Sequence, residues 1–219
     1  MRQALMVAMI ALAAAGACAG QDAKKADYNI TAHLENSHIV DSLLLSRAKA
    51  LASSMFAGIG INLQWKVGVP QGSHLLKEGC LSDADAEVLI HLVADASETS
   101  CPKARAYTLL DAQSMVQVTI FYDRVLDRLG NTSLNTALLA HILVHEITHA
   151  VQGVARHSEE GVMKARWSLE DQDQMRRAPL TFLPEDIQLI RRGLDRRSCK
   201  TQVAARASSQ PGPAGPGQR

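Results

Sequence analysis

The chain has 219 residues, of which 47% are hydrophobic and only 4% aromatic, so we expect one domain with a mostly aliphatic core. Its 23 Lys and Arg residues nearly balance 22 Asp and Glu residues, and this neutrality argues against nucleic acid as a partner. No internal repeat is visible in the sequence.

The first residues, Met1–Ala19, are typical of a signal peptide. Arg2 supplies the positive charge, Leu5–Ala15 is apolar, and Ala17-Cys18-Ala19 fits the small-x-small cleavage pattern. The apolar run is shorter than the ~20 residues that a membrane span requires. A lipoprotein beginning at Cys18 is the alternative, but the leucine usual before such a cysteine is missing. We therefore expect cleavage after Ala19, no membrane span, and a secreted or periplasmic protein.

Cleavage at that point leaves three cysteines, Cys80, Cys101 and Cys199. Cys80 and Cys101 flank a strand candidate and could form a disulfide in an oxidising compartment. Cys199 is left over near the C-terminal end. None has the C-x-x-C spacing of a zinc site, so we do not expect these cysteines to bind metal.

Alternating and helical patterns follow one another in the first part of the chain. Tyr28–Leu34 alternates enough for a short strand, and Ile61–Val67 alternates with a period of two. Between them, apolar residues at helical spacing predict a helix that is capped by Asn36 or Ser37 and runs to about Ala57. Gly58 and Gly60 are expected to end it.

Three further strands are predicted before the middle of the chain. Glu87–Ala94 is almost continuously apolar, as in a strand covered on both faces, and its His91 is expected to be a core histidine. Arg105–Leu110 and Met115–Tyr122 are separated only by Asp111–Ser114, which predicts an antiparallel hairpin.

The most informative stretch is a helix that is capped within Asn131–Ser133 and runs to about Gln152. It contains His145-Glu146-Ile147-Thr148-His149, an H-E-x-x-H motif with apolar flanks. Residues four apart share one helix face, so both imidazoles can bind one Zn²⁺ ion, and Glu146 is placed to act as a base. Ionisable groups in such an apolar helix are costly unless paired or metal-bound. His141 lies one turn earlier on the same face of the helix. It could contact and orient the metal ligands, but we favour a buried, hydrogen-bonded histidine.

The helix is followed by Gly153, which can end it, by His157 and by Gly161-Val162-Met163. Two short helices are then predicted, over Leu169–Arg177 and over Pro184–Arg196, where proline suits the first turn. From Thr201 onward the apolar periodicity is lost. The expected organisation is a signal peptide over residues 1–19, one catalytic domain over residues 20–198 and a disordered tail over residues 199–219.

The order of these elements and the residues after the motif resemble the metzincin clan of zinc peptidases. The resemblance implies an α+β fold with a mixed twisted sheet, an antiparallel edge strand, two long helices and a helical C-terminal subdomain. It also implies His145, His149 and His157 as zinc ligands, Glu146 as the base, Gly153 as the helix-ending turn and Met163 as the Met-turn residue. The chain departs from the clan in spacing, because H-E-x-x-H-x-x-x-G-x-x-x-H is one residue longer at each step.

The function implied by the resemblance is an exported zinc-dependent metalloendopeptidase, monomeric, which hydrolyses peptides or proteins by metal-activated water. Substrate would lie along the Arg105–Leu110 edge strand, and Lys164 to Trp167 would wall a specificity pocket. Two alternatives stay open. Glu170 could replace His157 as third ligand, as in gluzincin-type peptidases, or the protein could bind zinc without catalysis. The presence of Glu146 argues against the second alternative, because a structural zinc ion needs no base.

Overall fold

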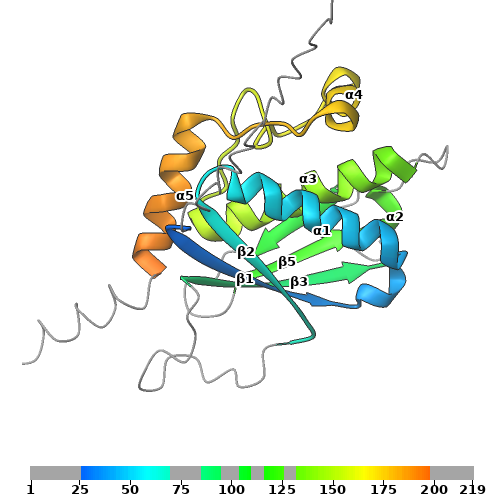
Figure 1. The fold of residues 1–219 in the computed structure, drawn as a ribbon, viewed down its shortest axis with the longest axis horizontal. Coiled ribbons are helices and arrows are strands. Elements are labelled where there is room, and N and C mark those ends of the chain that lie inside the picture. The colour runs from blue at the N-terminus through cyan, green and yellow to red at the C-terminus, as the bar shows by residue number, and fades with distance from the viewer. Residues whose placement is uncertain (1–25, 70–84, 95–103, 110–115, 126–131, 198–219) are drawn as a thin grey trace, which may run out of the picture.

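A mixed sheet of five strands carries the fold, with the strand order β2-β1-β3-β5-β4. This computed structural model describes residues 26–69, 85–94, 104–109, 116–125 and 132–197. The strands span Tyr28–Glu35 (β1), Ile61–Val67 (β2), Ala86–Val93 (β3), Ala106–Leu109 (β4) and Val116–Phe121 (β5). All pairings are parallel except that of β4 with β5, which is antiparallel and confirms the predicted hairpin at the sheet edge (Figure 1).

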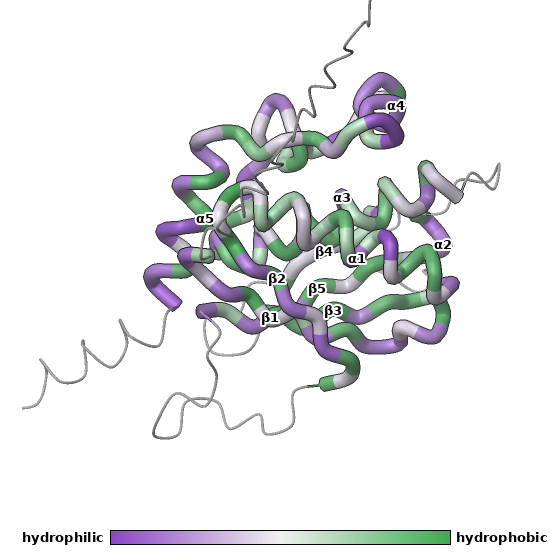
Figure 2. The backbone as a smooth tube through the Cα atoms, viewed as in Figure 1, coloured by the Kyte–Doolittle hydropathy of each residue, from purple (hydrophilic) through white to green (hydrophobic). Residues whose placement is uncertain are grey.

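The strand register places the apolar side chains of neighbouring strands on one face of the sheet. Ile30 of β1 pairs with Ala86 of β3, and Ile90 of β3 pairs with Val118 of β5. Ile30, Ile90 and Val118 are each fully buried. Helices α1 and α3 lie over this face (Figure 1), and the hydrophobic colouring follows the strands beneath them (Figure 2). The alternation in the sequence therefore becomes a core between the sheet and two helices.

Helix α1 spans Ser42–Ala57 and begins later than the sequence pattern indicated. Asn36 has a left-handed backbone (φ 56°), and a 3₁₀ turn over Ser37–Ile39 follows it. The cap is Asp41, whose side chain accepts a hydrogen bond from the Leu44 N–H at 2.8 Å. The prediction of Asn36 or Ser37 as the cap was therefore wrong, because the chain must first turn out of β1.

Helix α3 spans Thr132–Gln152 and is the most deeply enclosed element. Every residue from Ala137 to Gln152 is buried, since α3 contacts α1, α4, α5 and the sheet. Helix α4 spans Leu169–Arg177 and α5 spans Pro184–Arg197. α5 approaches α3 closely at Gly193, where a Cβ atom would lie 2.0 Å from the Val151 carbonyl oxygen. The H-E-x-x-H motif thus lies in a helix held on several sides.

Some predictions need correction and others fall outside the described residues. A short helix α2, Tyr122–Val125, follows β5 and was not predicted. His91 is not a core histidine: its side chain is partly exposed and its Nδ1 lies 2.5 Å from Glu35 Oε2. The signal peptide, the disulfide candidates Cys80 and Cys101, and the tail lie outside the described residues. Among the helices described, none is both long and apolar enough to cross a membrane.

Candidate metal centre

Three histidine side chains converge beside helix α3. His145 and His149 come from successive turns of α3, and His157 comes from the segment after it. His145 Nε2 lies 3.0 Å from His149 Nε2, which lies 3.3 Å from His157 Nε2. Three nitrogen ligands at tetrahedral angles around zinc are about 3.4 Å apart, given zinc–nitrogen distances of about 2.05 Å. The spacing of the three Nε2 atoms therefore fits a zinc ion.

The other ring nitrogens of the two helical histidines fix which nitrogen can bind metal. His145 Nδ1 donates to the Val162 carbonyl oxygen at 2.9 Å, and His149 Nδ1 donates to the Val154 carbonyl oxygen at 3.2 Å. A carbonyl oxygen can only accept, so the proton of each neutral ring is on Nδ1 and the Nε2 lone pair faces the cluster. This is the tautomer that zinc binding through Nε2 requires.

Burial also keeps these two rings in the neutral form that ligates metal. It lowers the pKa of His145 to about 4, and the hydrogen bond with Val162 opposes this shift only in part. The pKa of His149 is lowered as well, again mainly by burial. Both rings are therefore neutral near pH 7 and can bind a cation without first losing a proton.

The chain leaves α3 through a left-handed residue. Gly153 has φ +69°, and its N–H donates to the His149 carbonyl oxygen at 3.0 Å, which closes the last turn of the helix. Residues with a side chain rarely adopt this conformation. The segment then turns back toward α3, so that His157 reaches the helical histidines despite the longer spacing of this motif.

A closed turn follows His157 and contains Met163. The Ser158 N–H donates to the Met163 carbonyl oxygen at 2.9 Å, and Ser158 forms a bridge with Lys164. Met163 is completely buried. Gly161 has φ +73°, and a Cβ atom there would lie 2.3 Å from the Thr181 carbonyl oxygen, so only glycine fits. The turn packs on α3 through the bond between Val162 and His145.

Glu146 lies beside the histidine cluster and is 8% exposed. Thr108 of β4 donates its hydroxyl to Glu146 Oε2 at 2.5 Å. Burial raises the pKa of Glu146 to about 7, while the hydrogen bond from Thr108 lowers it. A carboxyl group with this pKa can both take up and release a proton near neutral pH.

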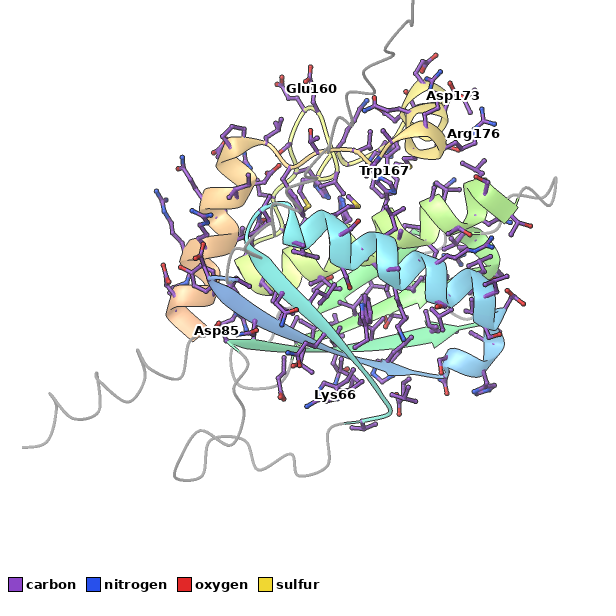
Figure 3. The ribbon with its side chains drawn as sticks, viewed as in Figure 1. Lys66, Asp85, Glu160, Trp167, Asp173 and Arg176 are labelled. Atoms are coloured by element: carbon purple, nitrogen blue, oxygen red, sulfur yellow. The ribbon has the colours of Figure 1, made fainter. Side chains whose placement is uncertain are left out.

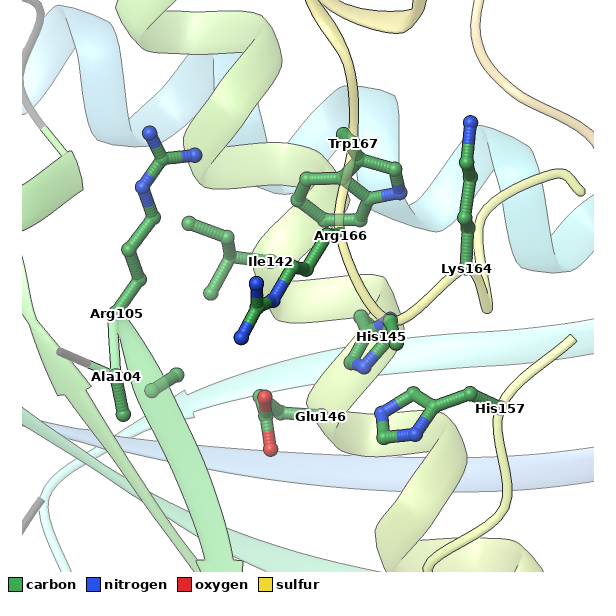
Figure 4. A pocket seen from close by; sticks show the side chains of 11 residues that line it. Ala104, Arg105, Ile142, His145, Glu146, His157, Lys164, Arg166 and Trp167 are labelled. Carbon is green, nitrogen blue, oxygen red and sulfur yellow. The ribbon is translucent and has the colours of Figure 1, made fainter. Parts of the chain in front are cut away.

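A cavity of about 670 Å³ opens over these residues (Figure 4). It lies between β4 and the segment after Met163, with α3 as its floor. Its lining includes the following residues: Ala104, Arg105, Ala106, Ile142, His145, Glu146, His157, Lys164, Ala165, Arg166 and Trp167. Trp167 packs edge-on against His145, with ring centroids 5.6 Å apart. Figure 3 shows Trp167 beside α3, on the side of the molecule that carries α4.

Two other candidates from the sequence lie elsewhere. Glu170 is in the first turn of α4, is exposed, and is absent from the metal-binding cluster found among the described residues. Its pKa is lowered first by a hydrogen bond with Ser168. His141 is fully buried, donates from Nδ1 to the Ala137 carbonyl oxygen and accepts the Leu180 N–H at Nε2, 3.0 Å away. His141 is thus a hydrogen-bonded core histidine, as favoured from the sequence.

Two residues of the site had no clear signal in the sequence. Thr108 is one threonine in a short strand. The alternation of side chains along a strand indicates only which side of the strand Thr108 occupies. Asp186 is buried in the first turn of α5 and accepts hydrogen bonds from Ser158 and Arg156, on either side of His157. An acidic residue is common in a first helical turn, so its position gave no sign of this role.

No protein-family profile and no curated protein sequence matches the chain. Among solved structures, the crystal structure of archaemetzincin from Methanopyrus kandleri is similar, with a TM-score of 0.46 and 14% sequence identity. The match covers 81% of this chain and 99% of that chain. A match with so low a TM-score and identity gives no information about the chemistry of this protein. The function is therefore inferred from the residues of this chain.

Proposed function

We propose that the protein is a zinc-dependent metalloendopeptidase with His145, His149 and His157 as ligands and Glu146 as general base. The observation that supports this most is the convergence of three histidines, whose ligand nitrogens all lie within 4.8 Å of one another, beside a buried carboxylate. Three histidines would hold a zinc ion and leave one coordination position open for water or substrate, as catalytic sites require.

The residues of the chain divide the work of hydrolysis among them. A zinc ion held by the three histidines would supply polarisation of the scissile carbonyl and activation of water. Glu146 accepts a proton from the attacking water as the new carbon–oxygen bond forms, and it gives that proton to the departing amine as the carbon–nitrogen bond breaks. Thr108 holds the Glu146 carboxylate by its 2.5 Å hydrogen bond.

The position of β4 at the edge of the sheet is evidence for a peptide substrate. β4 is the last strand in the sheet order and pairs only with β5 among the described strands, so its other edge can pair with an extended peptide. Ala104, Arg105 and Ala106, at the start of β4, line the same cavity as Glu146. A peptide added to this edge would thus pass the histidine cluster.

His157 is a better candidate than Glu170 for the third ligand. The Nε2 atom of His157 lies 3.3 Å from that of His149, whereas Glu170 is exposed in the first turn of α4, where the helix dipole already favours an acid. The placement of Glu170 supports the histidine set over the gluzincin-type alternative.

Metal analysis tests the ligand set directly. About one zinc per chain is expected in the purified protein, and His145→Ala, His149→Ala or His157→Ala should lower its affinity by orders of magnitude. The matched control is His38→Ala, at an exposed histidine of the 3₁₀ turn, and Glu170→Ala should behave like that control. Unchanged zinc binding in the three cluster variants would contradict the proposal.

Hydrolysis of a proteome-derived peptide library tests the reaction. The wild-type protein should cleave internal peptide bonds, and Glu146→Gln should keep zinc but lose roughly 10²- to 10⁴-fold of the rate, because an amide cannot accept the proton. A zinc-loaded wild-type protein that cleaves no peptide, under conditions where a known zinc peptidase does, would leave only the non-catalytic alternative.

We also propose that the protein is exported, since Met1–Ala19 has the features of a signal peptide. Expression of the full chain, followed by fractionation and N-terminal sequencing, should give a mature protein that begins at Gly20. A lipid-modified Cys18 would establish the lipoprotein alternative instead.

The proposed Cys80–Cys101 disulfide is tested by non-reducing peptide mapping of the exported protein, and two free thiols would refute it.

A further inference from the structure

The cavity over the histidine cluster carries an excess of positive charge that the proposed reaction does not require. Its lining includes three cationic side chains, Arg105, Lys164 and Arg166, and a single carboxylate, Glu146. Thr108 already holds that carboxylate, which lies at the cavity floor beside the histidines. A bound zinc ion would add further positive charge.

One of the three cations has a partner within the protein. Lys164 Nζ lies 2.6 Å from Asp171 Oδ2, a carboxylate that also forms the capping box of α4. This ion pair fixes Lys164 at the edge of the cavity and offsets its charge. Lys164 is therefore available to a substrate only at the cost of that pair.

The two arginines have no such partner among the described residues. Within the part of the chain that the structure describes, neither the Arg105 nor the Arg166 guanidinium forms an ion pair or a hydrogen bond, and both residues are exposed. Arg105 immediately precedes β4 and Arg166 comes from the segment after Met163, so two separate segments bring them to one cavity. In Figure 4 Ile142 of α3 lies between them, while Lys164 lies beyond Trp167.

Two guanidinium groups that have no partner among the described residues repel each other in one cavity, and a carboxylate between or beside them offsets that repulsion. Arginine also binds carboxylates through paired N–H donors, in hydrogen bonds that are stronger than those between neutral groups. Apolar or cationic substrate groups would gain nothing comparable there. The chemistry of the cavity thus favours an anionic group on the substrate.

We infer that the protein prefers peptides with a carboxylate close to the scissile bond, bound by Arg105 and Arg166. The inference rests on the proposed peptidase function and names its substrate class. The carboxylate can be an acidic side chain or the C-terminal carboxylate of the peptide. Because both arginines line the cavity that holds Glu146 and His145, the carboxylate should lie within about two residues of the bond that is cleaved, given about 3.3 Å per residue of extended chain.

The kinetic test uses one cleavable host peptide in three forms. The first has Glu within two residues of the scissile bond and an amidated C-terminus. The second has Gln in place of Glu, and the third is a short Gln peptide with a free C-terminal carboxylate at that distance. We expect kcat/KM to be roughly tenfold higher for at least one carboxylate form than for the neutral form, as for a hydrogen bond to a charged group. Comparing the first and third forms identifies the source of the carboxylate.

Arginine variants connect this preference to the cavity. In the Arg105→Gln/Arg166→Gln double variant the ratio of kcat/KM between carboxylate and neutral forms should fall to about one, because the charged partners are gone. Arg47→Gln is the matched control, since Arg47 is an exposed arginine of α1 that does not line the cavity, and it should keep the wild-type ratio. Equal kcat/KM for all three peptides, or a preference that survives in the double variant, would overturn the inference.

A binding measurement separates the inference from the proposed function. In Glu146→Gln protein, peptide binding can be followed by fluorescence, because Trp167 is the one tryptophan of two in the chain that lines the cavity. The Glu peptide should bind roughly tenfold more tightly than the Gln peptide. Tighter binding of the Glu peptide without hydrolysis by the wild-type protein would support the inference and contradict the peptidase proposal. Hydrolysis by the wild-type protein, with equal binding and equal kcat/KM for the Glu and Gln peptides, would support the peptidase proposal and contradict the inference.

Discussion

Ser158 donates its hydroxyl to Asp186 Oδ1 at 2.6 Å and so joins the residue after His157 to the first turn of α5. The same oxygen accepts from Arg156 Nη1 at 3.3 Å, and the other oxygen accepts the Leu183 N–H. One carboxylate, only 1% exposed, thus holds both neighbours of His157. His157 is itself exposed, so we expect this anchor to hold it in place together with the contacts of its ring with His145 and His149.

Replacing Asp186 should therefore weaken zinc binding without removing a ligand. We expect roughly tenfold lower zinc affinity in Asp186→Asn, in the range seen when groups that orient metal ligands are changed. Glu185→Gln is the control, because it removes the other ion pair of Arg156 and keeps Asp186, which accepts the hydrogen bond from Ser158. Zinc affinity is measured by competition with a chelator. Equal affinity in Asp186→Asn and Glu185→Gln would show that Asp186 does not position His157.

The turn that contains Met163 should tolerate no side chain at Gly161. Gly161→Ala combines a left-handed φ of +73° with a Cβ only 2.3 Å from the Thr181 carbonyl oxygen, so the backbone must shift. We expect a loss of about 3 kcal/mol in the free energy of unfolding, measured with denaturant on chelator-treated protein.

Gly68 offers a matched control for the conformational part of that loss. It has φ +83°, but no atom of the described residues lies within 4 Å of the position its Cβ would take. Gly68→Ala should cost only about 1 kcal/mol, the usual penalty of the left-handed conformation. Similar losses in the two variants would mean that the close approach to Thr181 is relieved at no cost.

The parts of the fold that could be predicted from the sequence are those fixed by local patterns. The period-two alternation of Ile61–Val67 gave the limits of β2, and the short spacer at residues 111–114 gave the antiparallel pairing of β4 and β5. The buried H-E-x-x-H helix could be predicted as well, because its apolar residues cover all its faces. In each case the information lies within a few neighbouring residues.

The parts that could not be predicted depend on contacts between distant residues. Thr108 is 38 positions from Glu146, and Ser158 is 28 positions from Asp186. The sequence near Thr108 does not distinguish it from any other threonine in a strand. The sequence near Asp186 does not distinguish it from any other acidic residue at the start of a helix. His91 was assigned to the core from an apolar run, but its side of β3 faces Glu35 of β1, and the strand register decides this. The pairing of strands is not visible in a single strand.

Thr108 should affect catalysis through the orientation of Glu146. Thr108→Val keeps the shape and the strand preference of the side chain but removes the hydroxyl that donates to Glu146 Oε2 at 2.5 Å. Loss of one hydrogen bond to a charged group should lower kcat/KM by roughly tenfold, with unchanged zinc content. Thr108→Ser should restore most of the rate, since it brings back the donor. A Thr108→Val protein with wild-type kcat/KM would show that Glu146 needs no such support.

A histidine outside the candidate metal centre should contribute to the pH dependence of stability. His33 of β1 is 5% exposed, and its Nε2 has no hydrogen-bond partner among the described residues. Burial, the largest effect, lowers the pKa of His33 below the ordinary value of 6.5. Its charged neighbours partly cancel: Glu87 of β3, 4.0 Å away, raises the pKa and Lys66 of β2 lowers it, while a hydrogen bond with the Gly68 backbone raises it.

The sign of the effect follows from these pKa values. Below pH 6.5, and down to the lower pKa of the folded protein, the unfolded chain binds a proton at His33 that the folded protein does not. Acid therefore favours unfolding in this interval, and the contribution of His33 to stability is lost as the pH falls.

His33→Gln cannot titrate, so its free energy of unfolding should fall less between about pH 7.5 and about pH 5.5, which lie on either side of the ordinary histidine pKa. The measurement is made by urea denaturation of chelator-treated protein, in which the cluster histidines titrate equally in variant and wild type. His38→Gln, at the exposed histidine of the 3₁₀ turn, is the control and should keep the wild-type difference. If His33→Gln shows that same difference, His33 is not a source of the acid sensitivity.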